Sequence, residues 1–250
     1  MFCLIVGTII GLVTGYLGSL MFSKRMSLVA GPLGHLALPG IALALLYNFD
    51  VSLGAFIFII LGIILIWLIE LRTKLPLEAL VAIVFSFGVA LAFLFLPLEK
   101  AEAALIGDIS KIGRIDGWIA IFLAFISFFL ILKIFPKLVL INISEDLAKV
   151  EQINLKIYNL LYLFTIAIMV GLGVKLVGGL LTAALVAIPS SSARNLAKNL
   201  FQYQFFSGFF GFISCLFGIL LSYSIQIPAG LLIILISTLI FFFSVILKNN

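Results

Sequence analysis

Charged residues and cysteines are scarce in this chain of 250 residues. Asp, Glu, Lys and Arg together make up 10% of it, against about 25% in soluble domains. The two cysteines, Cys3 and Cys215, both lie in apolar stretches, so we predict neither a disulfide framework nor a cysteine metal cluster. The 15 basic residues are dispersed between long apolar runs, which excludes the clustered basic face of a nucleic-acid-binding protein.

Sequence motifs of enzymes are missing as well. The chain has no GxxxxGK[ST] phosphate loop and no HExxH pair, and its long apolar runs contain no pair of carboxylates. Enzyme chemistry and a carboxylate proton relay therefore have no obvious site. We predict that the chain is not an enzyme.

Apolar runs make up most of the sequence, since 64% of the residues are hydrophobic. Nine membrane helices of about 20 residues would use about 180 residues, which leaves only short loops. Charged residues are costly inside a bilayer, so they mark the helix ends. We predict an all-α integral membrane protein, a bundle of about nine transmembrane helices that forms a single domain over residues 1–250. The expected helices are 2–23, 34–47, 52–69, 79–96, 117–132, 157–174, 176–193, 204–224 and 228–247.

The basic residues predict the orientation of these helices. With the N-terminus outside, eleven of the fifteen basic residues would lie on the inner side of the membrane. Lysine and arginine are enriched on the cytoplasmic side of membrane proteins. The N-terminus is therefore expected outside and the C-terminus inside.

Small residues predict close helix packing at both ends of the chain. Glycines recur along one stripe of the first expected helix and again in the eighth, where they would let a neighbouring helix approach closely. The contact could lie within one chain or between two subunits. These glycines are Gly7, Gly11, Gly15, Gly208, Gly211 and Gly218.

His35 is the only histidine in the sequence. Pro39 lies four residues later and removes the helical partner of the His35 carbonyl. Unpaired backbone at membrane depth is tolerated only where protein or a water-filled cavity satisfies it, and neutral imidazole is a common metal ligand. His35 is thus a candidate for contact with a metal ion in transit. The alternative is a histidine that is hydrogen-bonded to a neighbouring helix and serves packing.

A second unusual segment ends the seventh expected helix with the sequence IPSSSAR, residues 188–194. Pro189 frees the carbonyl of Leu185, and serines can hydrogen-bond to nearby carbonyls. The segment could shape the inner mouth of a pathway. Alternatively, it is an ordinary helix terminus at which Arg194 extends to the membrane surface.

The longest polar stretch is residues 142–159, on the expected cytoplasmic side. Its apolar residues Leu147, Val150 and Ile153 are spaced by three, which predicts an amphipathic helix along the surface. Such a helix could bind a partner protein or be a solvated loop without one.

Several segments, in order along the chain, carry a family resemblance. They are KRMSL at 24–28 with HLALPGIA at 35–42, GDI at 107–109, SEDLA at 144–148, the stretch 178–194 that ends in IPSSSAR, and LSY at 221–223 with IPAG at 227–230. The ordered set resembles the permease subunits of the metal-ion ABC transporters for zinc, manganese and iron.

The resemblance implies a homodimeric permease in a prokaryotic cytoplasmic membrane. Two cytoplasmic ATPase subunits would bind and hydrolyse ATP, and an extracytoplasmic metal-binding protein would deliver the divalent ion. No covalently bound cofactor is implied. His35 takes the position of the family's motif histidine, which is associated with metal passage. The ATPase-docking loop would be Ser144, Glu145, Asp146, Leu147 and Ala148, and the gate or pore-shaping residues would be Pro39, Gly40, Pro189, Ser190, Ser191, Ser192 and Arg194.

The chain departs from the family pattern at two positions. Gly31 stands where the family commonly has an aspartate four residues before the histidine, and Gln152 stands where the docking loop usually has glycine. Loss of the aspartate removes a hard anionic ligand. It motivates an alternative, an ABC permease for a metal chelate or an organic cofactor. A stand-alone secondary transporter or channel is a further alternative, but it would normally use the intramembrane carboxylates that this sequence lacks.

Overall fold

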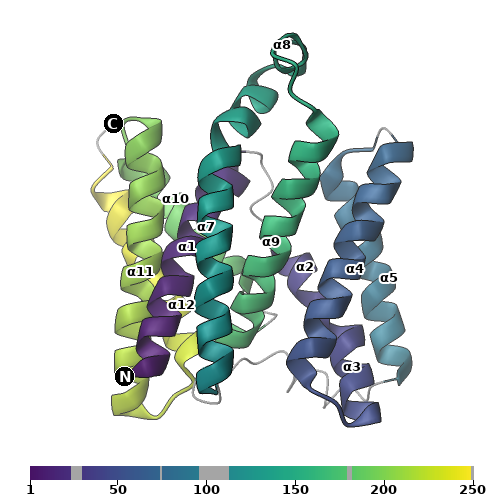
Figure 1. Ribbon diagram of the computed structural model, residues 1–250. Helices are drawn as coiled ribbons and strands as arrows, with labels where there is room; N and C mark the ends of the chain where they lie inside the picture. Colours follow the sequence, from purple (N-terminus) through teal and green to yellow (C-terminus); the bar gives the residue numbers. More distant parts are fainter. Residues whose placement is uncertain (24–29, 74, 96–112, 179–181, 249–250) are drawn as a thin grey trace.

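The structure is a computed structural model that describes residues 1–23, 30–73, 75–95, 113–178 and 182–248. Every regular element within these residues is an α-helix (Figure 1), which confirms the predicted fold class. The helices are α1 (Phe2–Ser23), α2 (Ala30–His35), α3 (Ala37–Tyr47), α4 (Val51–Arg72), α5 (Leu77–Phe95), α7 (Arg114–Ile143), α8 (Glu145–Val150), α9 (Leu155–Val177), α10 (Thr182–Leu196), α11 (Leu200–Ile225) and α12 (Ala229–Ile246).

Within the described ranges, seven helices are long and apolar enough to cross a membrane: α1, α4, α5, α7, α9, α11 and α12. The other two expected crossings are shorter helical segments. They are the α2–α3 pair, Gly31–Tyr47, and α10, which has 15 residues. The two termini lie at opposite ends of the bundle, and α8 lies at the same end as the C-terminus (Figure 1). The count of nine crossings and the orientation stay predictions.

Three of the differences from the expected helix boundaries have a clear physical cause. The segment 34–47 is interrupted at Leu36, because Pro39 has no N–H to donate to the carbonyl of His35. Helix α7 continues past 132 to Ile143, since a charged residue marks the membrane boundary rather than the helix end. The segment 176–193 is divided at Gly178, whose φ of 94° lies in the left-handed region that favours glycine.

Helix α1 runs through the interior of the bundle and packs closely on α11. A Cβ on Gly11 would lie 2.7 Å from the carbonyl oxygen of Gly211, and a Cβ on Gly15 would overlap the carbonyl of Ser207. The two backbones are therefore in direct contact, as small residues permit in membrane helices. The predicted glycine stripe thus serves packing within one chain.

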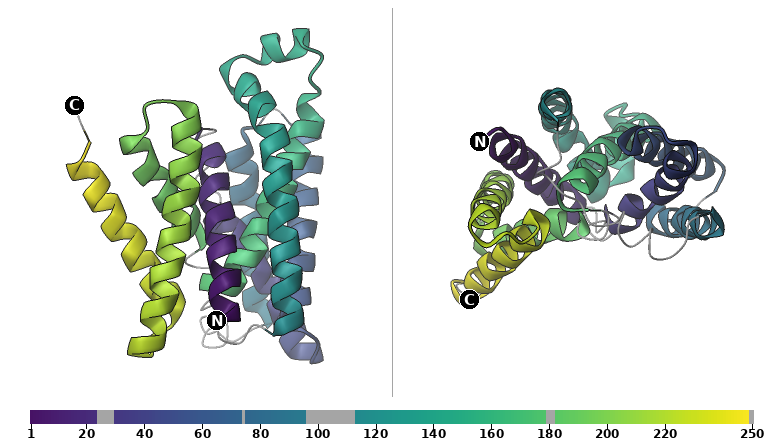
Figure 2. Two further views of the ribbon diagram at one scale, coloured as in Figure 1. Left: turned by 60° about the vertical axis from the view of Figure 1, so that its left-hand side comes forward. Right: turned by 90° about the horizontal axis from the view of Figure 1, so that it is seen from below.

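Helices α3, α4 and α5 form one flank of the bundle, and α11 and α12 form the other (Figures 1 and 2). Helices α3 and α4 cross where Gly40 and Gly54 face each other, each without room for a Cβ. Asp50 begins α4, because its Oδ1 accepts the backbone N–H of Leu53 at 2.9 Å, which is a common helix cap. Helix α9 contacts both α4 and α7 between the flanks.

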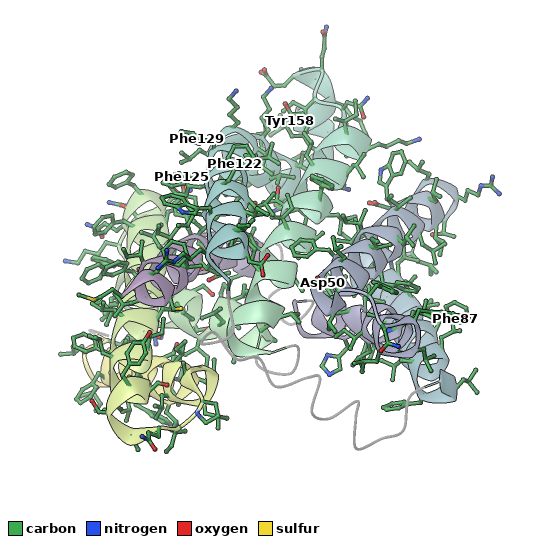
Figure 3. All side chains as sticks on the ribbon, turned by 60° about the horizontal axis from the view of Figure 1, so that its bottom comes forward. Asp50, Phe87, Phe122, Phe125, Phe129 and Tyr158 are labelled. Carbon is green, nitrogen blue, oxygen red and sulfur yellow. The ribbon has the colours of Figure 1, made fainter. Side chains whose placement is uncertain are left out.

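Large aromatic side chains lie on the outside of this bundle. Phe87 of α5 and Phe122, Phe125 and Phe129 of α7 are each at least half exposed (Figure 3). Large apolar side chains exposed in this way are unfavourable in water but suit the hydrocarbon interior of a bilayer. The exposed face agrees with an integral membrane protein.

Candidate functional site

His35 lies at the break between α2 and α3. It is the last residue of α2, and the N–H of Leu36 bonds to the carbonyls of Pro32 at 3.3 Å and Leu33 at 3.2 Å. The second bond is the tighter contact of a 3₁₀ turn. The imidazole is half-buried and meets the ring of Phe85 on α5 edge-on, with 5.6 Å between the ring centroids.

A contact with the backbone determines which ring nitrogen of His35 keeps a lone pair that a metal ion could bind. Its Nδ1 lies 2.9 Å from the carbonyl oxygen of Gly31. A carbonyl only accepts, so Nδ1 carries the proton and Nε2 of the neutral ring keeps its lone pair. Backbone carbonyls often orient metal-binding histidines in this way. Gly31, although it has no side chain, therefore directs the Nε2 atom of His35.

The surroundings of His35 are narrow and poor in other ligands. A Cβ on Gly31 would lie 3.2 Å from the Cβ of Ala183, at the start of α10. No group of three or more His, Cys, Asp or Glu side chains in the described part of the chain could hold a metal ion. A lone imidazole suits transient contact with a passing ion better than a closed metal site.

Pro39 and Gly40 face α4 and α5 rather than a polar space. Pro39 lines an apolar cavity of about 130 Å³ together with Leu36, Phe58 and other apolar residues of α4 and α5. Gly40 packs on the backbone of Gly54. These contacts fix the α3–α4 hairpin next to His35, and the gating role of the two residues stays a prediction.

The IPSSSAR segment forms the second half of α10. Pro189, Ser190 and Ser192 are buried, and both serines donate to carbonyls one turn earlier at 2.9–3.0 Å. Ser190 also packs against Gly18 of α1. The serine hydroxyls thereby bond to the carbonyls around the proline.

The end of the same segment is open to the surroundings. Ser191 is half-buried and Arg194 is exposed, with its guanidinium 5.8 Å from the ring centre of Tyr203 on α11. The segment therefore contacts α1 and α11, whereas His35 contacts α5. Among the described residues, α2 packs on α10 and both helices contact α9, so the two predicted sites belong to neighbouring helices.

The predicted docking loop forms α8, which lies at the end of the bundle between α7 and α9 (Figure 1). Ser144 caps it, since its Oγ accepts the N–H of Leu147 at 3.3 Å. Glu145 is its first residue, and the Glu145 side chain lies outside the described part. Asp146 is exposed and pairs with Lys149 at 3.1 Å. Ala148 is fully buried against the core.

One face of α8 is apolar and exposed. Leu147 is 53% exposed and Val150 is 78% exposed, and Ile143 at the end of α7 is 72% exposed. Ile153, by contrast, packs inward against the core. Of the three apolar residues in the predicted pattern, Ile153 therefore anchors the loop to the core, whereas Leu147 and Val150 stay exposed at the end of the bundle.

Gln152 closes α8 in the conformation that glycine normally supplies. Its φ is 56°, its N–H bonds to the carbonyl of Lys149 at 3.0 Å, and the N–H of Ile153 bonds to that of Ala148 at 2.9 Å. This pattern is a Schellman C-cap. The loop thus makes the turn at this position although glutamine replaces the glycine expected from the family.

Sequence reasoning missed the residues that tie this loop to the rest of the bundle. Asn159 donates to Glu70 Oε1 of α4 at 2.8 Å, and Trp67 Nε1 donates to the carbonyl of Lys156 at 3.3 Å. We call these two hydrogen bonds the α4–α9 clamp. Their partners are 89 residues apart, so no local pattern could have paired them. Only the position of Glu70 at the end of a long apolar run was a visible signal.

These membrane-length helices, with the short α8 between two long ones at one end, are those of a polytopic membrane protein. The chain belongs to the ABC 3 transport family, whose family model matches residues 1–248.

Similar proteins agree with this assignment. The manganese import system permease protein ScaB of Streptococcus parasanguinis is 27% identical over 96% of this chain and 88% of its own length. The high-affinity zinc uptake system membrane protein ZnuB of Buchnera aphidicola is 28% identical over 95% of this chain and 94% of its own. The structure of PsaBC from Streptococcus pneumoniae in complex with Fab matches with a TM-score of 0.80 and 26% identity, over 97% of this chain and 89% of that one.

These comparisons confirm the predicted family. The chain is a transport subunit rather than an enzyme, and it is a multi-pass protein of a prokaryotic cytoplasmic membrane. Two of the segments that carried the resemblance, 24–28 and 107–109, lie outside the described residues.

Proposed function

We propose that this chain is the permease subunit of an ATP-driven importer for divalent transition-metal ions. Manganese and zinc are the first candidates because the similar permeases are named for these metals, and iron is the third metal of the family. Residues 1–250 would act as one transmembrane domain. Two copies would form the pathway, an extracytoplasmic metal-binding protein would deliver the ion, and ATP would be bound only by partner subunits.

The observation that carries the proposal is the free Nε2 of His35 at a helix break. Neutral imidazole binds zinc and manganese through such a lone pair. Because Nδ1 is held by the Gly31 carbonyl, the ring needs no rearrangement when an ion arrives. A single neutral ligand also releases the ion readily, which a transport pathway requires.

The ATPase would dock on α8. The uncovered side chains of Leu147 and Val150 offer an apolar contact, and the exposed Asp146 offers a charged one. Apolar side chains at the centre of such a contact supply most of its free energy, with polar groups at its rim. The face of α8 is therefore suited to a protein partner.

Movement of α8 would reach His35 through rigid contacts. The α4–α9 clamp joins the base of α9 to α4, and the crossing of Gly54 with Gly40 joins α4 to α3. Rigid-body motion of such packed elements is a common form of conformational switching. Nucleotide-driven movement of α8 would thus alternate access to the His35 region, with Pro39, Gly40 and the IPSSSAR end of α10 shaping the gates.

Metal uptake in cells that express the chain with its ATPase and binding protein tests the proposal. We expect accumulation of manganese or zinc, measured by elemental analysis, that disappears when the ATPase is inactivated. The matched variant His35→Ala should lower uptake while the complex still assembles. Uptake that continues without an active ATPase would contradict the proposal and favour a secondary transporter or channel.

Gly31 favours a second candidate, an ABC permease for a metal chelate or an organic cofactor. Helix α2 has no acidic residue, so it places no carboxylate beside the imidazole. ATPase stimulation in the reconstituted complex separates the two candidates. Stimulation of the ATPase by binding protein that carries Zn²⁺ or Mn²⁺ without a chelator supports the ion importer. Stimulation only by a metal chelate supports the second candidate.

A further inference from the structure

The helix break beside His35 is seated in a notch between two glycines. Leu36, the residue at the break, is 3% exposed. A Cβ on Gly62 of α4 would lie 2.7 Å from Cδ1 of Leu36, and a Cβ on Gly88 of α5 would lie 3.1 Å from its Cδ2. Ordinary contact begins at 3.4 Å, so the Leu36 side chain fits there only because neither residue has a side chain. We call Gly62 and Gly88 the Leu36 notch.

The same face of α5 also supports the imidazole. Phe85 comes three residues before Gly88, which places both residues on one face of the helix. The ring of Phe85 meets that of His35 edge-on, with 5.6 Å between their centroids. A Cβ on Gly88 would also lie 3.8 Å from Cγ of Pro39. Residues 35, 36 and 39, which surround the break, therefore lie against one stripe of α5.

The backbone links the position of the Leu36 side chain to that of the imidazole. The N–H of Leu36 bonds back into the last turn of α2, and the same turn holds the contact of 2.9 Å between Nδ1 of His35 and the Gly31 carbonyl. Pro39 has no N–H with which to fix the His35 carbonyl from the other side. A shift of Leu36 would therefore turn the end of α2 and move Nδ1 relative to its acceptor.

We propose that Gly62 and Gly88 are positioning residues for His35. By admitting the Leu36 side chain, they keep the last turn of α2 against α5, so that Nδ1 stays bonded to the Gly31 carbonyl and Nε2 stays available. The inference rests on the proposed function for the role of this nitrogen in metal passage. A cavity of about 130 Å³ adjoins the notch, so a displaced Leu36 has space into which to move. Alanines in the notch should therefore shift the segment without unfolding the chain.

Nitrogen NMR of the full-length chain tests this inference, because His35 is the only histidine. The chain carries isotope-labelled histidine, has no histidine tag, and is measured in detergent at alkaline pH, where imidazole is neutral. We expect a protonated Nδ1 and an unprotonated Nε2 in the wild type. Gly62→Ala with Gly88→Ala should shift both ring signals, and Gly88→Ala alone should shift them less. Unchanged ring signals in the double variant would overturn the inference, whether or not the chain transports metal.

Titration of the same samples with Zn²⁺ alone, read from the Nε2 signal, measures the consequence for metal binding. The double alanine variant should bind Zn²⁺ about tenfold more weakly, as is common when the group that orients a metal-binding histidine is disturbed. In a Leu36→Ala background the same two alanines should leave the affinity unchanged, because the side chain that they displace is absent. An equal loss of affinity in both backgrounds would overturn the inference.

Gly171→Ala is the matched control. The three atoms nearest to its Cβ would all belong to Phe56, the closest at 2.8 Å, so it adds a comparable contact that does not involve Leu36. Its ring signals and its affinity for Zn²⁺ should be those of the wild type. The same loss of affinity in Gly171→Ala would show a general packing effect and overturn the inference. A wild-type complex that takes up neither manganese nor zinc would instead contradict the proposed function.

Discussion

The crossing of α1 with α11 permits a quantitative prediction for Gly11→Ala. The added Cβ would lie 2.7 Å from the carbonyl oxygen of Gly211, whereas ordinary contact begins at 3.4 Å, so the helices must separate by about 0.7 Å. The same Cβ would overlap the sulfur of the buried Cys215. Overpacking of this kind costs about 1–3 kcal/mol. For a chain of this length, 2 kcal/mol corresponds to a decrease in Tm of about 4–8 °C.

Gly208→Ala is the matched control on the same helix pair. Its Cβ would lie 3.3 Å from the carbonyl oxygen of Leu12 and 3.7 Å from the nearest side-chain atom, so almost no movement is needed. Alanine also favours the helix over glycine by about 1 kcal/mol. Thermal unfolding of the purified variants, followed by the fluorescence of Trp67 and Trp118, measures both effects. The packing argument fails if Gly11→Ala has the same Tm as the wild type, or if the Tm of Gly208→Ala is lowered as much as that of Gly11→Ala.

Three further predictions concern transport. His35→Ala should lower metal uptake at least tenfold (about 1.4 kcal/mol) with unchanged assembly, measured by uptake and by gel filtration of the complex; normal uptake would remove His35 from the pathway. Reversing the charges at Glu145 and Asp146 to lysine should prevent co-purification of the ATPase, and an intact complex would contradict docking on α8. Glu70→Ala should remove one of the two hydrogen bonds of the α4–α9 clamp, the one from Asn159, worth about 1.5–3 kcal/mol. ATP hydrolysis should then continue while uptake per ATP falls; an unchanged ratio would show that the clamp does not transmit motion.

Much of the local structure could be predicted from single residues. Pro39 predicted that the backbone around His35 would be unsatisfied, and the structure breaks the helix there. The polar stretch 142–159 predicted a surface helix, and α8 forms inside it. In both segments the signal is local, because a proline removes one specific hydrogen bond and charges exclude a segment from hydrocarbon.

Other features depend on the exact backbone geometry or on contacts between distant segments. At Gln152, where the family pattern has glycine, the Schellman bonds hold glutamine in the left-handed conformation. The free Nε2 of His35 follows from where the Gly31 carbonyl points. Glu70 and Asn159 meet only because α4 and α9 pack side by side. None of these could be worked out from spacing along the chain.

The amino-acid sequence by itself determined that this protein lies in a membrane, that its elements are helices, and that a helix is interrupted near Pro39. Those properties follow from transfer free energies and backbone hydrogen bonds, which each segment carries alone. The tertiary structure decided which helices touch and how the α8 loop is tied to α4. These are properties of pairs of helices, and in a bilayer such pairs are selected by close packing of small residues, which composition alone does not specify.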